Sequence, residues 1–347
     1  MSAHEDGIKV LLRHTVDSHA SDLHLSSGSP FMVRIHGSMI PFGDGPVDAE
    51  TVQKLIDEIL TEEQSKQLQQ NRELDFSLHI SDIGRFRVNV FRQRRGWAGV
   101  LRVIPDKIPD MDALGLPKTI KELIDLDYGL ILVTGPTGSG KSTTLASMID
   151  YINTTKDGHI ITIEDPIEFI HASKKCVVNQ REIGPDTHSF GNALRSALRE
   201  DPDYILVGEM RDLETIALAL TAAETGHLVF GTLHTSSAPK TITRIIDVFP
   251  ENQQNQIRIM LSESIQGIIA QKLYPRRDEP GRIAAFEIMI ATQAVRNMIR
   301  EEKVFQLESV IQTGRQMGMR ALEQSKRTLV SEGKLSPEYL KERLTLY

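Results

Sequence analysis

Residues 130–145 read Leu-Ile-Leu-Val-Thr-Gly-Pro-Thr-Gly-Ser-Gly-Lys-Ser-Thr-Thr-Leu. Large apolar residues open the stretch, a glycine-rich turn follows, and a Lys-Ser-Thr then begins a helical pattern. A buried strand, a G-x-x-x-x-G-K-[ST] loop and a helix in this order distinguish a phosphate-binding loop from a chance glycine-rich turn. The stretch therefore predicts a binding site for a nucleoside triphosphate.

The residue types of this loop suit phosphate chemistry. Glycines let successive backbone N–H groups converge on phosphate oxygens, and the helix N-terminus adds positive potential. Lys141 can reach the β- and γ-phosphates, and the Ser142 hydroxyl can hold Mg²⁺. The expected nucleotide-binding residues of the loop are Gly135, Pro136, Thr137, Gly138, Ser139, Gly140, Lys141, Ser142 and Thr143.

The composition is that of an ordinary globular chain. Its 347 residues, with 40% hydrophobic and 25% charged residues, predict about two domains. The single cysteine, Cys176, excludes intrachain disulfides and cysteine-rich zinc modules. We expect a cytoplasmic protein, because there is neither a long apolar run nor a signal-peptide pattern at the N-terminus. The net charge of −7 argues against nucleic acid as the main partner.

The apolar pattern divides the chain into two parts. The first part predicts a small domain with helices over 7–18 and within 48–68, and strands over 21–25, 31–35, 84–93 and 97–104. From residue 118, apolar strands alternate with helices, which is typical of a mostly parallel sheet. Its expected strands are 130–133, 159–163, 204–207, 228–233 and 284–288, followed by a helical tail. We expect domains at 1–104 and 118–347, joined by a proline-containing linker at 105–117.

An acid, Glu209, follows the buried strand Tyr204–Val207. P-loop enzymes usually place an aspartate that serves Mg²⁺ at such a strand end, and Gly208-Glu209 takes its place here. The longer side chain could reach the metal through water, or it could orient the attacking water. A lone acid after a strand can also be a helix cap, but the phosphate loop upstream favours the functional role.

Three further acids, Glu164, Asp165 and Glu168, gather at another strand end. Carboxylates so close together should raise at least one pKa by repulsion unless a cation lies among them. A solvated acidic loop is the alternative. We expect Glu164 to lie nearest the phosphates, because it is nearest the strand.

Two histidines, His227 and His234, bracket a fourth buried strand. They lie too far apart along one strand to share a metal ion. A donor that senses the γ-phosphate is the more attractive role, and a structural histidine remains open for each.

Arginines are concentrated in the first domain. They are Arg34, Arg85, Arg87, Arg92, Arg94, Arg95 and Arg102. A solvated strand face is one explanation, and arginine fingers that neutralise phosphate charge are another. Nucleic-acid binding is disfavoured, because no aromatic ladder accompanies the arginines. Arg195 and Arg199, four residues apart, are further finger candidates unless they pair with Glu200 or Asp201.

Taken together, these motifs resemble the secretion ATPases of type II and type IV pilus systems. The phosphate loop, the Thr162–Glu168 segment, Gly208–Asp212 and the two-histidine strand occur in that family's order. Ser21–Leu25, Gly84–Asn89 and Ala294–Glu301 resemble its retraction (twitching motility) branch. Assembly-type relatives usually carry an additional N-terminal domain and often a four-cysteine motif, which we do not expect here.

The resemblance implies a PAS-like α+β N-terminal domain, a RecA-like P-loop ATPase domain and a homohexamer that uses ATP and Mg²⁺ at the cytoplasmic face of the inner membrane. The implied partners are an inner-membrane platform protein, the pilus base and a second retraction ATPase. Lys141 would hold the phosphates, Ser142 and Glu209 the Mg²⁺, and Glu164 would activate water. His234 would sense phosphate, and Arg87 and Arg102 are the arginines that best match the family's nucleotide-contacting arginines. Which of Glu164 and Glu209 is the base stays open.

The resemblance also implies that Ala294–Glu301 is needed for pilus retraction. A helix here would present Arg296, Asn297, Arg300 and Glu301 as a polar surface. Three other functions remain possible: a pilus assembly or type II secretion ATPase, a catalytically idle partner of a paralogue, and a nucleic-acid translocase.

Overall fold

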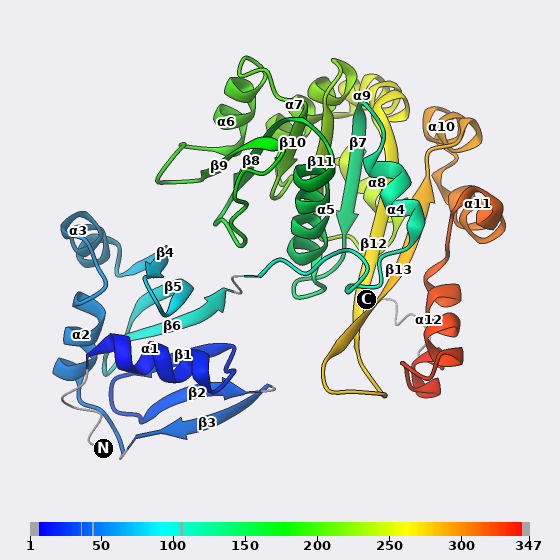
Figure 1. Cartoon of the computed structure of the whole chain (residues 1–347). Helices are drawn as coiled ribbons and strands as arrows, with labels where there is room; N and C mark the ends of the chain where they lie inside the picture. The colour runs from blue at the N-terminus through cyan, green and yellow to red at the C-terminus, as the bar shows by residue number, and fades with distance from the viewer. Residues whose placement is uncertain (1–6, 36, 44, 105–106, 342–347) are drawn as a thin grey trace. The chain divides into compact units, whose positions relative to one another are not determined.

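The computed structural model describes residues 7–35, 37–43, 45–104 and 107–341. The chain forms two compact units, Met1–Lys107 and Ile108–Tyr347 (Figure 1). Among the described residues, no helix is long and apolar enough to cross a membrane.

The first unit is an α+β fold around an antiparallel sheet of order β3-β2-β1-β6-β5-β4. Its strands are β1 (Asp22–Ser26), β2 (Phe31–Ile35), β3 (Ser38–Phe42), β4 (Glu73–Ile80), β5 (Gly84–Gln93) and β6 (Gly96–Ile104). Its helices are α1 (Ile8–Asp17), α2 (Ala49–Asp57) and α3 (Glu62–Asn71). Apolar and polar residues alternate along β5, so one face of the strand is apolar. On that face Phe86, Val88 and Val90 are buried in the core beside the helices.

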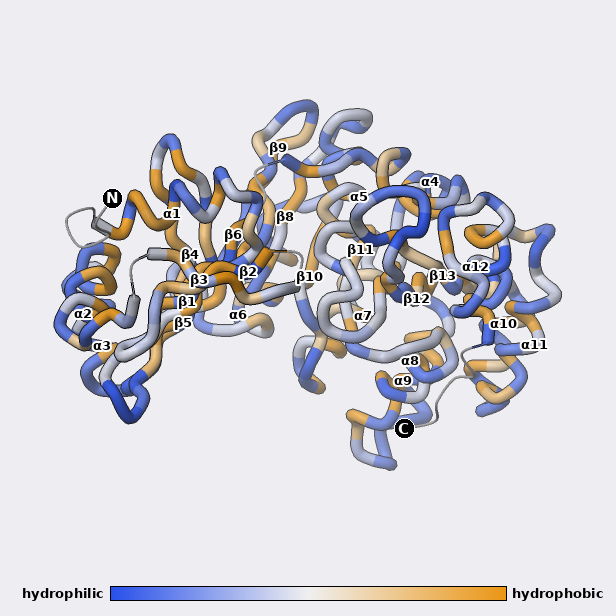
Figure 2. Tube along the Cα trace, turned by 90° about the horizontal axis from the view of Figure 1, so that it is seen from below, coloured by the Kyte–Doolittle hydropathy of each residue, from blue (hydrophilic) through white to orange (hydrophobic). Residues whose placement is uncertain are grey.

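The helical pattern expected within 48–68 is two helices rather than one. The chain leaves the helical conformation at Thr61, which is the N-cap of the second helix. The Thr61 hydroxyl accepts from the Gln64 backbone N–H, and the Gln64 side chain accepts from the Thr61 N–H. This capping box starts α3. Figure 2 shows hydrophilic and hydrophobic residues alternating along α2, as one buried helix face requires.

The second unit is built on a sheet of order β13-β12-β7-β11-β10-β8-β9. Its strands are β7 (Gly129–Thr134), β8 (Gly158–Glu164), β9 (Cys176–Glu182), β10 (Tyr204–Val207), β11 (Leu228–Leu233), β12 (Ile265–Pro275) and β13 (Arg282–Ile290). Every neighbouring pair is parallel except β12 and β13. The prediction of a mostly parallel sheet is therefore confirmed.

Helices cover both faces of this sheet (Figure 1). Leu130 and Leu132 of β7 point into one core, and Ile131 and Val133 point into the other. Helices α4 (Lys118–Ile124) and α5 (Lys141–Thr155) pack in the core of Ile131. The core of Leu130 contains residues of α6 (Phe190–Ala197), α7 (Leu213–Glu224), α8 (Ala238–Asp247), α9 (Glu251–Ser264), α10 (Gln293–Arg300) and α11 (Leu307–Thr313).

The remaining elements of the second unit follow α10 in the chain. They are α12 (Leu322–Ser331) and the short 3₁₀ helices η1 (Val304–Gln306), η2 (Gly314–Met317) and η3 (Pro337–Leu340). Part of the segment expected as a linker also packs in this unit: Met111 and Leu116 are buried in the core beside α4.

Candidate functional site

The phosphate loop joins the end of β7 to the start of α5. Gly135, Gly138 and Gly140 have φ values of 148°, 76° and 87°, in the region that favours glycine. A Cβ on Gly135 would overlap the backbone oxygen of Gln271 on β12. A Cβ on Gly138 would meet no atom within 4 Å, so space lies open beside the loop at that residue.

Lys141 begins α5 and is only 9% exposed. Its Nζ donates to the backbone oxygens of Gly135 at 2.9 Å and Pro136 at 3.2 Å, and it lies 3.5 Å from Nδ1 of His234. Burial lowers the pKa of Lys141, while the charges of Glu209 and Glu168 oppose that shift. The lysine therefore lies inside the loop that is to bind phosphate.

His234 connects the loop to the strand-end acid. Its Nε2 lies 2.9 Å from Oε1 of Glu209, and its Nδ1 faces the Lys141 ammonium. A neutral ring with the proton on Nε2 satisfies both contacts, since Nδ1 then accepts from Lys141 and Nε2–H donates to Glu209. The structure thus brings together Lys141, His234 and Glu209 from three separate segments.

Arg211 holds the second oxygen of Glu209, with Nη2 at 2.6 Å from Oε2. Partial burial alone would raise the pKa of Glu209, but Arg211 and His234 outweigh it and lower that pKa. Glu209 is therefore a carboxylate at neutral pH. Helix capping is the task of another acid: Asp212 caps α7 by accepting from the Thr215 N–H.

Glu164, at the end of β8, has a different environment. The Thr162 hydroxyl donates to its Oε1 at 2.7 Å, and Nε2 of Gln180 donates to the same oxygen at 3.2 Å. The pKa of Glu164 is raised to about 7, mainly by burial; the two donors and a hydrogen bond from the Glu168 backbone oppose this rise, and the charge of Glu168 adds to it. The predicted rise of one pKa among the clustered acids is therefore found at Glu164, but its main cause is burial and not repulsion between the carboxylates.

The two histidines that flank β11 play different roles. The ring of His227 contacts the backbone oxygen of Ala222 at 3.0 Å and the Thr225 hydroxyl at 3.3 Å, at the end of α7. This contact is structural, whereas His234 lies at the phosphate loop.

The described residues hold no group of three or more His, Cys, Asp or Glu side chains arranged for a metal. A magnesium site of the P-loop type needs none, because Mg²⁺ is held there mainly by phosphate, water and one or two protein oxygens. Ser142, in the first turn of α5, and the carboxylate Glu209 are hard oxygen donors of the type that fits Mg²⁺.

Arg87 and Arg102 are directly opposite each other on β5 and β6 of the first unit. Nε of Arg102 donates to Oδ1 of the buried Asp22 at 2.8 Å, and Nε of Arg34 lies 3.8 Å from Oδ2 of the same residue. The three arginines therefore lie in one register row across the sheet, and Arg34 and Arg102 share the Asp22 carboxylate.

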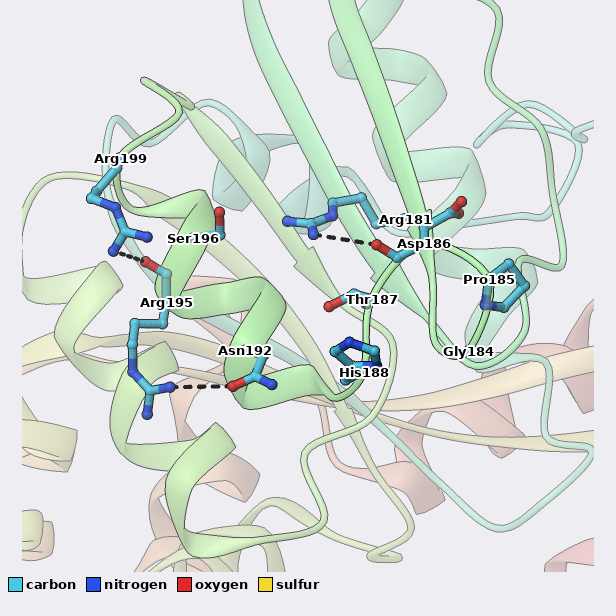
Figure 3. Close-up of a pocket in the computed structure, with 10 residues that line it drawn as sticks. All are labelled: Arg181, Gly184, Pro185, Asp186, Thr187, His188, Asn192, Arg195, Ser196 and Arg199. Carbon is cyan, nitrogen blue, oxygen red and sulfur yellow. Dashed lines mark hydrogen bonds between the residues drawn. The ribbon is translucent and has the colours of Figure 1, made fainter.

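Arg195 on α6 and Arg199 in the turn that follows α6 lie beside an open depression of about 540 Å³ (Figure 3). The depression is also lined by Arg181, Gly184, Pro185, Asp186, Thr187, His188, Asn192 and Ser196. Arg195 pairs with Glu214, and Arg199 donates to the Arg195 backbone oxygen. Pairing of either with Glu200 or Asp201 was one expectation, but Glu200 instead accepts from Arg181 and Ser196.

The expected polar surface of α10 needs one correction. Arg296 does not extend into solvent: its Nη1 donates to the backbone oxygens of Ser262 at 2.7 Å and Glu263 at 2.8 Å, and its Nη2 donates to Oε1 of Gln266 at 2.9 Å. It therefore caps the C-terminus of α9. The periodicity of α10 could not reveal this, because the acceptors come from another helix.

Two further residues at the site were not predicted from the sequence. Gln271 of β12 is 3% exposed and donates from Nε2 to the Ser139 backbone oxygen at 2.6 Å, so it supports the phosphate loop. Gln180 of β9 contacts Glu164. No local motif marks either residue, since both reach the site only through strand order.

Comparison with known proteins agrees with this geometry. The profile of the family described as "Type II/IV secretion system protein" matches residues 3–342. The chain belongs to this family. A family member from Pseudomonas aeruginosa, "Type IV pilus retractation ATPase PilT", is 55% identical over 97% of each chain. The "Twitching motility protein" of Neisseria gonorrhoeae is 53% identical over 90% of this chain and 83% of its own.

A solved structure extends the similarity to three dimensions. The crystal structure of "the Pilus Retraction Motor PilT and Bound ADP" has a TM-score of 0.90 at 50% identity, with 97% of each chain covered. The resemblance drawn from the motifs is therefore confirmed, and so is the two-part α/β ATPase fold.

Proposed function

We propose that the protein is an ATPase that drives type IV pilus retraction, the disassembly of pilins that produces twitching motility. The observation that carries this proposal is the Lys141–His234–Glu209 constellation at a phosphate loop. It occurs in a chain that aligns over 97% of its length with a retraction ATPase. An ADP-bound structural relative supports nucleotide binding.

We assign the catalytic roles from position and charge. Lys141 compensates phosphate charge, and Ser142 and Glu209 serve Mg²⁺, which when bound polarises the phosphate oxygens. Glu164 takes a proton from the attacking water, because its pKa of about 7 lets it gain and release a proton near neutral pH. His234 reports the state of the γ-phosphate to Glu209 through its two ring nitrogens.

We assign Arg87 and Arg102 to nucleotide phosphate as arginine fingers. Their placement in one row of the first unit's sheet supports joint action. An Arg87→Ala variant with full turnover would return that residue to the role of a solvated strand face.

The assembly that we propose is a homohexamer at the cytoplasmic face of the inner membrane. Its partners are the platform protein, the pilus base and a second retraction ATPase, with no role for nucleic acid. A pilus assembly or secretion ATPase would have the same chemistry with the opposite output.

Turnover of the purified protein tests the enzymatic part. Wild type should hydrolyse ATP, and Lys141→Ala and Glu209→Ala should abolish hydrolysis while circular dichroism stays unchanged. Wild-type turnover in either variant would overturn the assignment. Absence of turnover in wild type would favour an idle partner of a paralogue, and stimulation by DNA or RNA would favour a translocase.

A further inference from the structure

Gln180 lies where two parallel strands place three side chains on one face. Thr162 of β8 is the register partner of Gln180 on β9. Glu164 lies two residues beyond Thr162, and side chains two apart point to the same face of a strand. The two donors and the acid are therefore neighbours through pairing of the strands.

Both the nitrogen and the oxygen of the Gln180 side-chain amide form hydrogen bonds. Its Nε2 donates to Oε1 of Glu164 at 3.2 Å and to the backbone oxygen of Phe169 at 2.8 Å, and its Oε1 accepts from the His171 N–H at 2.8 Å. The opposite orientation of the amide would set oxygen against oxygen at Glu164 and Phe169. Only a neutral group that both donates and accepts can make these contacts.

These bonds connect the acid to the loop that follows it. Phe169 and His171 belong to the connection between β8 and β9 and are 7% exposed each. The hydrogen bonds of Gln180 therefore join this connection to β9, and the same side chain also binds Glu164. The Thr162 hydroxyl binds the same carboxylate oxygen at 2.7 Å.

We propose that Gln180, together with Thr162, is a positioning residue that fixes the Glu164 carboxylate through Oε1 in the orientation in which it receives the proton of the attacking water. The inference rests on the proposed role of Glu164 and deepens it. A carboxylate with one oxygen held by two donors cannot rotate freely, and fixed geometry of this kind contributes to the rate.

The two donors also stabilise the charged form of the acid. Their removal should raise the pKa of Glu164 further, with Glu168 as the nearby charge that acts in the same direction. A base must be deprotonated to act, so the acidic limb of the pH–rate profile should move to higher pH. A residue that only stabilised the fold would not move this limb.

The test compares ATPase pH–rate profiles of the full chain for Gln180→Leu, Gln180→Glu and Thr162→Val. Asn179→Ala is the matched control, because this exposed neighbour on β9 hydrogen-bonds the His159 ring and not Glu164. We expect kcat to fall about tenfold or more in the three variants, as loss of a hydrogen bond to a charged group predicts. We expect KM to stay within about twofold and the acidic limb to move upward, with Asn179→Ala unchanged.

Wild-type kcat and an unmoved acidic limb in folded Gln180→Leu or Gln180→Glu would overturn the inference. If both fail to fold, Thr162→Val decides, since it removes only the hydroxyl donor. Glu164→Gln separates this failure from failure of the proposed function. Should Glu164→Gln turn over normally, the role of Glu164 falls and the inference falls with it; should only the Gln180 variants be normal, the inference falls alone.

Discussion

The imidazole of His234 lies 2.9 Å from the Glu209 carboxylate at the ends of two neighbouring parallel strands. The other ring nitrogen lies 3.5 Å from Nζ of Lys141. His234 therefore links the lysine of the phosphate loop to Glu209 through a single side chain.

His234→Ala should lower kcat about 10- to 100-fold and leave ATP binding nearly intact, since the phosphate ligands of the loop remain while the link to Glu209 is lost. His227→Ala, at the opposite end of β11, is the matched control. It removes a structural contact at the end of α7, so it should lower thermal stability and keep kcat within about threefold. Equal rates in the two variants would remove His234 from the mechanism.

Two loop glycines should differ sharply on substitution. Gly135→Ala should abolish nucleotide binding, because the new Cβ overlaps the Gln271 backbone oxygen at a positive φ. Gly138→Ala has open space and should cost only about 1–2 kcal/mol of stability from its φ. Binding of a fluorescent ATP analogue and thermal unfolding measure both effects. Normal binding by Gly135→Ala would contradict the packing described for the loop.

The first unit should lose stability in acid through Asp22. Burial alone would raise the pKa of Asp22, but the Ser21 hydroxyl and the Arg102 guanidinium outweigh it and lower that pKa below its ordinary value. A carboxyl with a lowered folded-state pKa stabilises the fold above its unfolded pKa of about 4, and this stability is lost as pH falls through the folded value.

Asp22→Asn should therefore destabilise the first unit by about 1 kcal/mol at pH 7, with the difference shrinking below about pH 4. The exposed Asp75→Asn on the same sheet is the control. Urea unfolding at several pH values measures the difference. A constant difference down to pH 3 would show that Asp22 acts by packing rather than by charge.

The sequence predicted the elements whose signals are local. The phosphate loop, β7, β10 and β11 each lie in a continuous apolar run or a spaced motif, so their positions were predictable. Strands β3, β4, β9 and β12 escaped prediction. Of these, β9 places only Cys176 and Glu182 firmly inside and so lacks a clear period.

The residues of the site also separate into those that a local motif predicts and those that it does not. Lys141, Glu164, Glu209 and His234 follow from motifs at strand ends. Gln180 and Gln271 do not, because each is an isolated glutamine that meets the site through a neighbouring strand. The predicted placement of Arg296 on the polar surface was wrong, since the sequence of one helix cannot tell whether a second helix supplies acceptors.

Arg296→Ala should lower Tm by about 2–4 °C, because a charged donor is removed from the C-terminal carbonyls of α9. Arg300→Ala is the matched control on the same helix, since Arg300 donates from Nη2 to the exposed Asn297 side chain. Calorimetry on both variants measures the effect. An unchanged Tm in Arg296→Ala would refute the capping role and return this arginine to the surface face of α10.

The output of the motor is tested most directly in cells. The measurement is pilus number and twitching in a deletion strain complemented with wild type or Lys141→Ala. A retraction ATPase predicts that the deletion strain keeps or accumulates pili and cannot twitch, that wild type restores twitching, and that Lys141→Ala does not. A deletion strain without pili would contradict retraction and favour assembly, and twitching restored by Lys141→Ala would contradict an ATP-driven stroke.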